Sequence, residues 1–228
     1  MNSRAMLANA PLARHSFVRV SPDAWDACVA SQPALAKEPL VRNWAARGWP
    51  LIVRRPGPCD VHKIGVPVGL PLPPIAGKQR ISTVVPADAI ISIERPPELA
   101  TLRDVAPKAW RATIDMLDLI AQRHHVACRA FGSLAWQGRT GLPYLTGQSD
   151  LDLLFDLPAT LDVHGALDAL LSDIARCAAY APMRIDGEVI RADGAGANWR
   201  ELRAAKGEVV VKMATDVVLA TVRVFAEG

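Results

Sequence analysis

The sequence predicts an α+β protein of two domains, and three observations support this prediction. First, short apolar runs separated by prolines give way near residue 95 to long amphipathic segments that alternate with brief apolar runs. Second, 228 residues are enough to bury two cores. Third, the chain is 50% hydrophobic and 21% charged, as folded globular proteins are. We therefore predict a smaller, Pro-rich α/β domain over 1–95 and a larger domain of a sheet with helices over 96–228.

The first half predicts short strands at 51–53 and 81–85, because each apolar run ends at a proline. The segment 66–74 is rich in proline, which removes amide donors and favours extended geometry. It is predicted to be an ordered loop or an edge strand. One helix is predicted within 34–47, where apolar residues recur at helical spacing before a Gly and a Pro.

The second half predicts a longer series of elements. Its residues 98–123 carry an apolar residue every three or four positions and are predicted to be helical, with Pro107 as the point of a break. Residues 125–131, 151–155 and 183–185 are predicted to be three strands of one sheet. Residues 161–180 are predicted to form one amphipathic helix, and residues 208–225 a closing strand pair.

The composition excludes several classes of protein. A net charge of +3 is too small for a dedicated nucleic-acid binder. No apolar run approaches the ~20 residues that cross a bilayer, and the first residues lack the apolar core of a secretory signal. The four cysteines are far apart and are interpreted as small buried thiols of a reducing compartment. We expect a cytoplasmic protein with neither nucleic acid nor membrane as a partner.

Two short motifs carry the chemistry. Asp150 and Asp152 are two residues apart on a predicted strand, so their side chains share one face. Two like charges so close together suit Mg²⁺, which prefers hard oxygen ligands. Gly132 and Ser133 follow an earlier strand, where a strand-to-helix turn offers backbone amides to a phosphate. Either motif alone is weak, but their order along the chain points to one site.

This combination resembles the nucleotidyltransferase superfamily, in which Gly-Ser precedes Asp-apolar-Asp. The resemblance implies a polymerase β-like mixed sheet with helices, and Mg²⁺ held by Asp150, Asp152 and a third carboxylate. Asp186 is the favoured third carboxylate and Glu188 its competitor, with one of the two expected to be only a turn residue. The spacer between the motifs is longer than usual, which predicts an enlarged loop over 137–148.

A longer stretch of sequence around these two motifs resembles a narrower family. Residues 131–137, 140–145 and 149–154 closely resemble the phosphoribosyl-dephospho-CoA transferases, also called malonate decarboxylase holo-acyl-carrier-protein synthases. This resemblance implies the substrate 2'-(5''-triphosphoribosyl)-3'-dephospho-CoA. It implies as acceptor a serine of the malonate decarboxylase acyl-carrier subunit, with pyrophosphate released.

Substrate-binding residues follow from the same resemblance. Gly132 and Ser133 are expected to hold the outer phosphates. A triphosphate also needs basic partners, and four side chains lie in segments that match the family. They are Lys78, Arg80, Arg129 and Lys212. The domain over 1–95 is expected to cover the substrate.

Two alternatives remain open at this point. The first is another Mg-dependent nucleotidyltransferase that uses the same carboxylates with a nucleoside triphosphate. The second is a non-catalytic binding module that keeps the nucleotidyltransferase fold. Both motifs are complete in this sequence, which favours an enzyme over a binding module.

Overall fold

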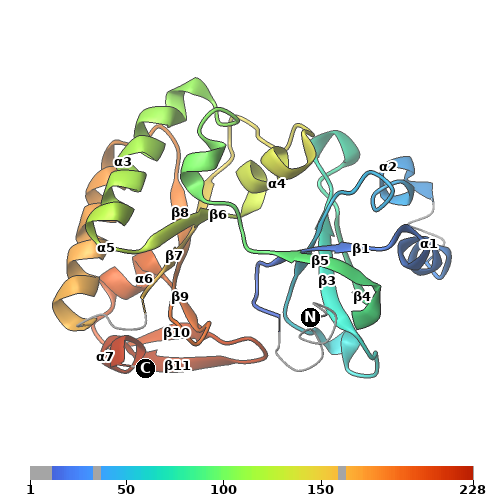
Figure 1. The fold of residues 1–228 in the computed structure, drawn as a ribbon. Helices are drawn as coiled ribbons and strands as arrows, with labels where there is room; N and C mark the ends of the chain where they lie inside the picture. Colours follow the sequence, from blue (N-terminus) through green and yellow to red (C-terminus); the bar gives the residue numbers. More distant parts are fainter. Residues whose placement is uncertain (1–11, 33–36, 159–162, 228) are drawn as a thin grey trace, which may run out of the picture. The chain divides into compact units, whose positions relative to one another are not determined.

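The computed structural model describes residues 12–32, 37–158 and 163–227, and it divides the chain into two compact units, Met1–Arg95 and Pro96–Gly228 (Figure 1). The first unit contains a five-stranded antiparallel sheet in the order β4-β3-β2-β1-β5. Its strands are β1 (Phe17–Val20), β2 (Leu51–Val53), β3 (Val66–Pro71), β4 (Arg80–Val85) and β5 (Ile90–Glu94). The strands predicted at 51–53 and 81–85 are thus confirmed.

Residues 66–71 of the Pro-rich segment 66–74 form a strand inside the sheet, so the prediction of a loop or edge strand was wrong for them. Strand β3 pairs with β2 on one side and with β4 on the other. The carbonyl of Pro67 accepts a hydrogen bond from the Arg54 amide, so this proline faces β2, and Pro71, four residues on, faces the same way. Because β2 is only three residues long, it needs no donor from either proline.

Two helices accompany this sheet, α1 (Pro22–Ala30) and α2 (Pro39–Arg42). The helix predicted within 34–47 is present only as α2, which gives way to turns, and residues 33–36 lie outside the described part. Helix α1 was not predicted, although Ser21 caps it, a proline begins it and an aspartate follows in its first turn. The buried indole of Trp25 donates to the Val41 carbonyl at 2.7 Å and joins the two helices.

Arg54 and Asp60 form a buried connection within the first unit. The Arg54 guanidinium donates to both carboxylate oxygens of Asp60, at 2.6 and 3.0 Å, and also to the carbonyls of Val68 and Thr83. These bonds from Arg54, with the Gly57 amide, lower the pKa of Asp60 to about 2. Arg54 is therefore a structural side chain that ties the end of β2 to β3 and β4.

The second unit is built on a mixed six-stranded sheet in the order β11-β10-β9-β8-β7-β6. Strands β7 and β8 are parallel, and the other neighbours are antiparallel. The strands are β6 (Ala127–Ala130), β7 (Leu151–Asp156), β8 (Ile185–Ile190), β9 (Gly196–Asn198), β10 (Glu208–Lys212) and β11 (Val217–Thr221). The prediction that 125–131, 151–155 and 183–185 contribute to one sheet is confirmed. The predicted pair over 208–225 is β10 and β11, followed by α7 (Val222–Glu227).

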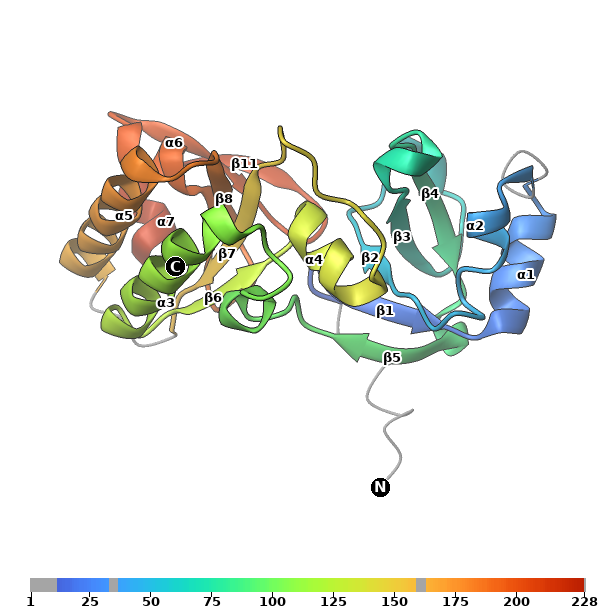
Figure 2. The same ribbon diagram turned by 90° about the horizontal axis from the view of Figure 1, so that it is seen from above.

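Helices α3 (Arg111–Arg123) and α5 (Val163–Tyr180) pack side by side in this unit (Figure 1). The helix predicted over 98–123 is confirmed only from residue 111, because short 3₁₀ turns at Leu99–Leu102 and Lys108–Trp110, on either side of Pro107, precede α3. Helix α5 confirms the prediction over 161–180 from residue 163 onward. It supplies the crossover that parallel strands require between β7 and β8. The unit also contains α4 (Gly132–Thr140) and α6 (Trp199–Ala204), and Figure 2 shows α4 starting where β6 ends.

The four cysteines are free thiols. Only Cys128 is buried, and this burial raises its pKa, whereas Cys59 is exposed, so the expectation of buried thiols holds for only part of the set. No helix among the described residues has both the length and the apolar character needed to cross a bilayer.

Candidate active site

The carboxylates of Asp152 and Asp186 lie on adjacent parallel strands. The two residues are register partners between β7 and β8, so their side chains leave the sheet on the same face. The Leu151 amide donates to the Arg184 carbonyl at 2.8 Å and extends this pairing to the start of β7. The sequence motif on β7 and the third carboxylate expected on a neighbouring strand are thereby brought together.

Gly132 lies against the carboxylate of Asp152. Its φ of +61° is in the left-handed region, and a Cβ built on it would lie 1.9 Å from Oδ2 of Asp152. The amide of Phe131, one residue earlier, donates to the Asp152 carbonyl at 3.0 Å. Only glycine fits this position, which explains why the Gly-Ser motif accompanies the aspartates.

Helix α4 begins at this point and points its first turn toward the carboxylates. Phe131 at the N-cap position contributes no side-chain hydrogen bond to that turn. The amides of a first helical turn have no partner within the helix, and the helix dipole favours an anion beside them. Ser133 is half-buried in the same turn. Gly132 and Ser133 therefore lie at a helix N-terminus beside Asp152, and phosphate binding by them stays a prediction.

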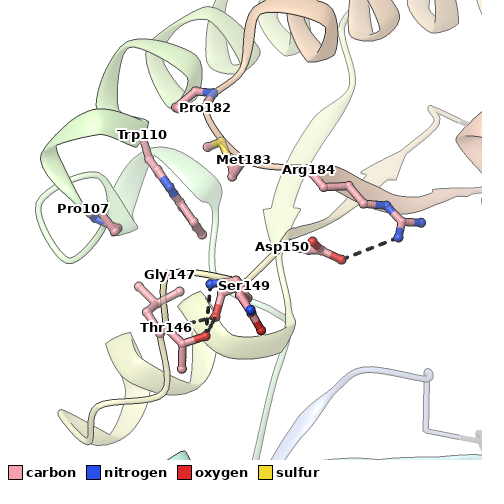
Figure 3. Close-up of a pocket in the computed structure, with 11 residues that line it drawn as sticks. Pro107, Trp110, Thr146, Gly147, Ser149, Asp150, Pro182, Met183 and Arg184 are labelled. Atoms are coloured by element: carbon pink, nitrogen blue, oxygen red, sulfur yellow. Dashed lines mark hydrogen bonds and ion pairs between the residues drawn. The ribbon is translucent and has the colours of Figure 1, made fainter.

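Arg184 lies between two of the aspartates. Its guanidinium is 3.9 Å from Oδ2 of Asp150, as Figure 3 shows, and 3.7 Å from Oδ2 of Asp186. The other oxygen of Asp186, Oδ1, accepts hydrogen bonds from the Gly187 amide at 2.9 Å and from the Asn198 side chain at 3.0 Å. Asp186 is thus fixed through Oδ1, and its Oδ2 faces the Arg184 guanidinium.

Glu188, the competitor for the third carboxylate, is in a different environment. Both Asp186 and Glu188 lie within β8, so the expectation that one of them is a turn residue was wrong. The reason is that β8 continues through Gly187 to residue 190. Glu188 is buried and forms an ion pair with Lys212 at 2.6 Å, and its carboxylate reaches across the space above Gly196. This pairing favours Asp186 as the third site carboxylate.

The basic residues expected to bind substrate have the following positions. Arg129 donates to Asp156 at 3.0 Å and to the Pro96 carbonyl at 3.1 Å, and Lys212 pairs with Glu188. Both thus already have structural partners within the second unit. Lys78 and Arg80 are exposed residues of the first unit. Their part in substrate binding stays a prediction.

The site contains oxygen ligands that suit a hard cation, but these ligands are not yet grouped as in a metal-binding site. Among the described residues, no three Asp, Glu, His or Cys side chains are grouped closely enough to hold a metal ion. The available donors are carboxylate oxygens, which Mg²⁺ prefers, and a guanidinium already lies between two of them. The donor chemistry fits Mg²⁺, and its binding by Asp150, Asp152 and Asp186 stays a prediction.

The segment after α4 forms an ordered loop. The loop was predicted over 137–148, but α4 continues to Thr140 and the loop starts after it. The Gln137 side-chain oxygen accepts from the amides of Tyr144 and Leu145, both at 3.1 Å. The Tyr144 ring stacks on Trp136, with their centroids 5.9 Å apart. Trp136 is therefore a buried anchor for this loop.

Sequence reasoning missed Arg184 and Asn198 as site residues. Arg184 is two positions before Asp186 and on the same face of the strand, which is a signal that the sequence contained. Asn198 reaches Asp186 from β9, a three-residue strand that no periodicity could identify. Its contribution depends on strand order, which is a property of the folded sheet.

Comparison with known proteins places both units in one family. Residues 13–96 match the family profile described as phosphoribosyl-dephospho-CoA transferase MdcG N-terminal domain, and residues 98–223 match that of the C-terminal domain. A phosphoribosyl-dephospho-CoA transferase of Bradyrhizobium diazoefficiens is 43% identical over 228 residues, which cover 100% of this chain and 98% of that protein. One from Xanthomonas euvesicatoria pv. vesicatoria is 33% identical over 204 residues, 89% of this chain and 91% of that protein. No solved structure matches significantly. The chain belongs to the phosphoribosyl-dephospho-CoA transferase family, as the sequence of residues 131–154 predicted.

Proposed function

We propose that the protein transfers the phosphoribosyl-dephospho-CoA group from 2'-(5''-triphosphoribosyl)-3'-dephospho-CoA to a serine of the malonate decarboxylase acyl-carrier subunit, releasing pyrophosphate. The observation that carries the proposal is the family match, which extends over both units and, in one relative, over the full chain. The geometry around Asp152 supports it, because a phosphate-binding helix end lies beside paired carboxylates.

We also propose that the second unit has the polymerase β-like nucleotidyltransferase fold. Three features support this assignment: a mixed sheet, a Gly-Ser turn that starts α4 directly after β6, and an Asp-Leu-Asp at the start of β7. The carboxylate on the parallel neighbour β8 completes the arrangement.

In this proposal Asp150, Asp152 and Asp186 bind Mg²⁺. When bound, Mg²⁺ would neutralise charge on the triphosphate and polarise the α-phosphorus. The amides of Gly132 and Ser133, at the positive end of α4, hold the outer phosphates and orient pyrophosphate for departure. Binding the triphosphate at a fixed helix end places the α-phosphorus beside β7 and β8.

The transfer forms one bond and breaks one. The serine oxygen of the carrier bonds to the α-phosphorus, and the bond from that phosphorus to the pyrophosphate oxygen breaks. The serine proton passes to Oδ2 of Asp186, because Oδ1 already accepts two hydrogen bonds. Arg184, beside Oδ2 and Asp150, balances negative charge on the donor.

The first unit is proposed to cover the donor and to contribute Lys78 and Arg80. The reaction is proposed for the cytoplasm, where free thiols such as the four found here persist.

Intact-mass spectrometry tests the proposal directly. The full chain is mixed with Mg²⁺, the triphosphoribosyl donor and the apo carrier subunit, and the carrier is weighed. We expect a gain of one phosphoribosyl-dephospho-CoA group, abolished by Asp152→Asn and kept by Asp168→Asn, a change at an exposed aspartate of α5. If the carrier gains no mass with the wild-type protein, but ATP or CTP modifies an acceptor, the general nucleotidyltransferase alternative replaces this one.

A further inference from the structure

A cavity of about 540 Å³ opens beside the carboxylates, entirely within the second unit (Figure 3). This volume is within the range of roughly 300–1,000 Å³ that small-molecule sites occupy. Asp150 and Arg184 belong both to its wall and to the site described above. A ligand in this cavity would therefore adjoin whatever reacts at the carboxylates.

The cavity has one largely apolar wall and one polar wall. The apolar wall is formed by side chains from the turn before α3 and from the segment before β8. They are Pro107, Trp110, Pro182 and Met183. The polar wall is the loop at 146–149, in which the Thr146 amide donates to the Ser149 hydroxyl at 2.9 Å and the Ser149 amide donates to the Thr146 carbonyl at 3.1 Å. These bonds hold the polar wall in shape before any ligand arrives.

Trp110 is the side chain that indicates which kind of ligand fits the cavity. It lines the cavity and is 7% exposed, and no hydrogen bond from its indole N–H is found within the described residues. Trp25 and Trp44, by contrast, donate to backbone carbonyls at 2.7 and 2.9 Å. The Trp110 N–H is not among the fully buried polar atoms that lack a partner, so it reaches solvent and can donate to water or to a ligand. Figure 3 shows the Trp110 ring directed from the turn before α3 toward the polar loop, where it lines the cavity.

We propose that this cavity binds the adenosine part of the donor, with the purine against Trp110 and Met183 and the free 3'-hydroxyl of its ribose on the loop 146–149. A purine has flat apolar faces and acceptor nitrogens on its edge, which suit an apolar wall with one free N–H donor. This inference rests on the proposed function, because in that donor a single ribose separates adenosine from the reactive triphosphate. The pantetheine arm, which is flexible and has no flat face, fits this wall less well.

The first test uses dephospho-CoA, which contains adenosine but no triphosphate, and the wild-type full chain. Saturation-transfer NMR should give the strongest transfer to the adenine H2 and H8 protons and weak transfer to the pantetheine protons. Strongest transfer to pantetheine, or no binding at all, overturns the inference. This measurement needs no variant and no turnover.

The second test compares Trp110→Phe with Trp199→Phe. Trp199 is the control, since it is also a buried tryptophan of the second unit, but it lies outside this cavity. Loss of one hydrogen bond should raise the Kd of dephospho-CoA about 3- to 10-fold for Trp110→Phe. Trp199→Phe should leave the Kd unchanged, and 4'-phosphopantetheine should bind both variants equally. An unchanged Kd for folded Trp110→Phe overturns the inference.

The two proposals fail in different ways. If adenine contacts are observed and depend on Trp110, but the carrier gains no mass, the nucleoside site stands and the proposed function falls. If the carrier gains mass and the KM of the donor is the same for Trp110→Phe as for wild type, the function stands and the nucleoside site falls.

Discussion

Gly132 and the carboxylate of Asp152 are so close that a Cβ on residue 132 would overlap Oδ2, at 1.9 Å. This contact joins the start of α4 to Asp152, one of the three aspartates of the site. The N-terminal end of α4 and the acidic strand are therefore one structural unit, and a change at either one disturbs the other.

Gly132→Ala should reduce the kcat of transfer at least about 100-fold, because the added methyl group must displace the carboxylate. The left-handed φ adds strain of about 1–2 kcal/mol. Gly141→Ala is the matched control: its φ is +72° and nothing lies within 4 Å of its Cβ. Both variants should unfold at reduced urea concentrations, with the larger reduction for Gly132→Ala, and only Gly132→Ala should lose activity. Equal activity losses would contradict the role given to this contact.

Asp186→Asn and Glu188→Gln should separate catalysis from stability. Asp186→Asn should lower kcat about 100-fold or more with little change in the free energy of unfolding, since Oδ1 can still accept its two hydrogen bonds. Glu188→Gln should cost about 1–3 kcal/mol of stability, because it leaves Lys212 without a buried anion. Paired urea titrations and single-turnover assays measure both effects. The reverse pattern would make Glu188 the third carboxylate.

Arg184→Gln should strengthen binding of a divalent cation about two- to fivefold, since it removes a positive charge between Asp150 and Asp186. Calorimetric titration with Mg²⁺, or Mn²⁺ detected by electron paramagnetic resonance, measures this without turnover. Arg176→Gln on α5 is the control, because that side chain is also mostly exposed and pairs with Asp173 instead. Unchanged or weaker cation binding in Arg184→Gln would contradict the prediction that the cation binds beside this charge, between Asp150 and Asp186.

The stability of the first unit should fall below pH 4 through Asp60. The pKa of Asp60 in the folded protein is about 2, below its ordinary value of 3.8, so its contribution is complete above pH 4 and is lost as the pH falls toward 2. The loss should be on the order of 1–2 kcal/mol. Urea unfolding of wild type and Asp60→Asn between pH 2 and 5 measures it as a difference between the two proteins. Parallel pH profiles would refute the contribution.

The carboxylate site was predictable because its signal is local. Alternation along residues 150–153 places Asp150 and Asp152 on one face. The apolar side chains of Leu151 and Leu153 lie on the other face and are 0% exposed. The Gly-Ser turn is equally local. The partners of Arg129 and Lys212 were not predictable, because each depends on which strand lies next to its own.

The fold was predictable where elements are long and periodic, as for α3 and α5. It was missed where short elements depend on tertiary contacts. Strand β3 tolerates Pro67 and Pro71 in the sheet interior only because its neighbour β2 is short, which composition does not reveal. Helix α1 could have been found from Ser21 and Pro22, which form an ordinary helix-start signal.

The crossover from β7 through α5 to β8 also determines when the site comes into existence during synthesis. A nascent chain that has emerged only as far as α5 has Asp150, Asp152 and the start of α4, but has neither Asp186 nor Arg184. Domains fold as they leave the ribosome, and pairing of parallel strands that are distant in sequence is slow. Premature release anywhere before β8 should therefore yield an inert polypeptide that cannot consume the donor.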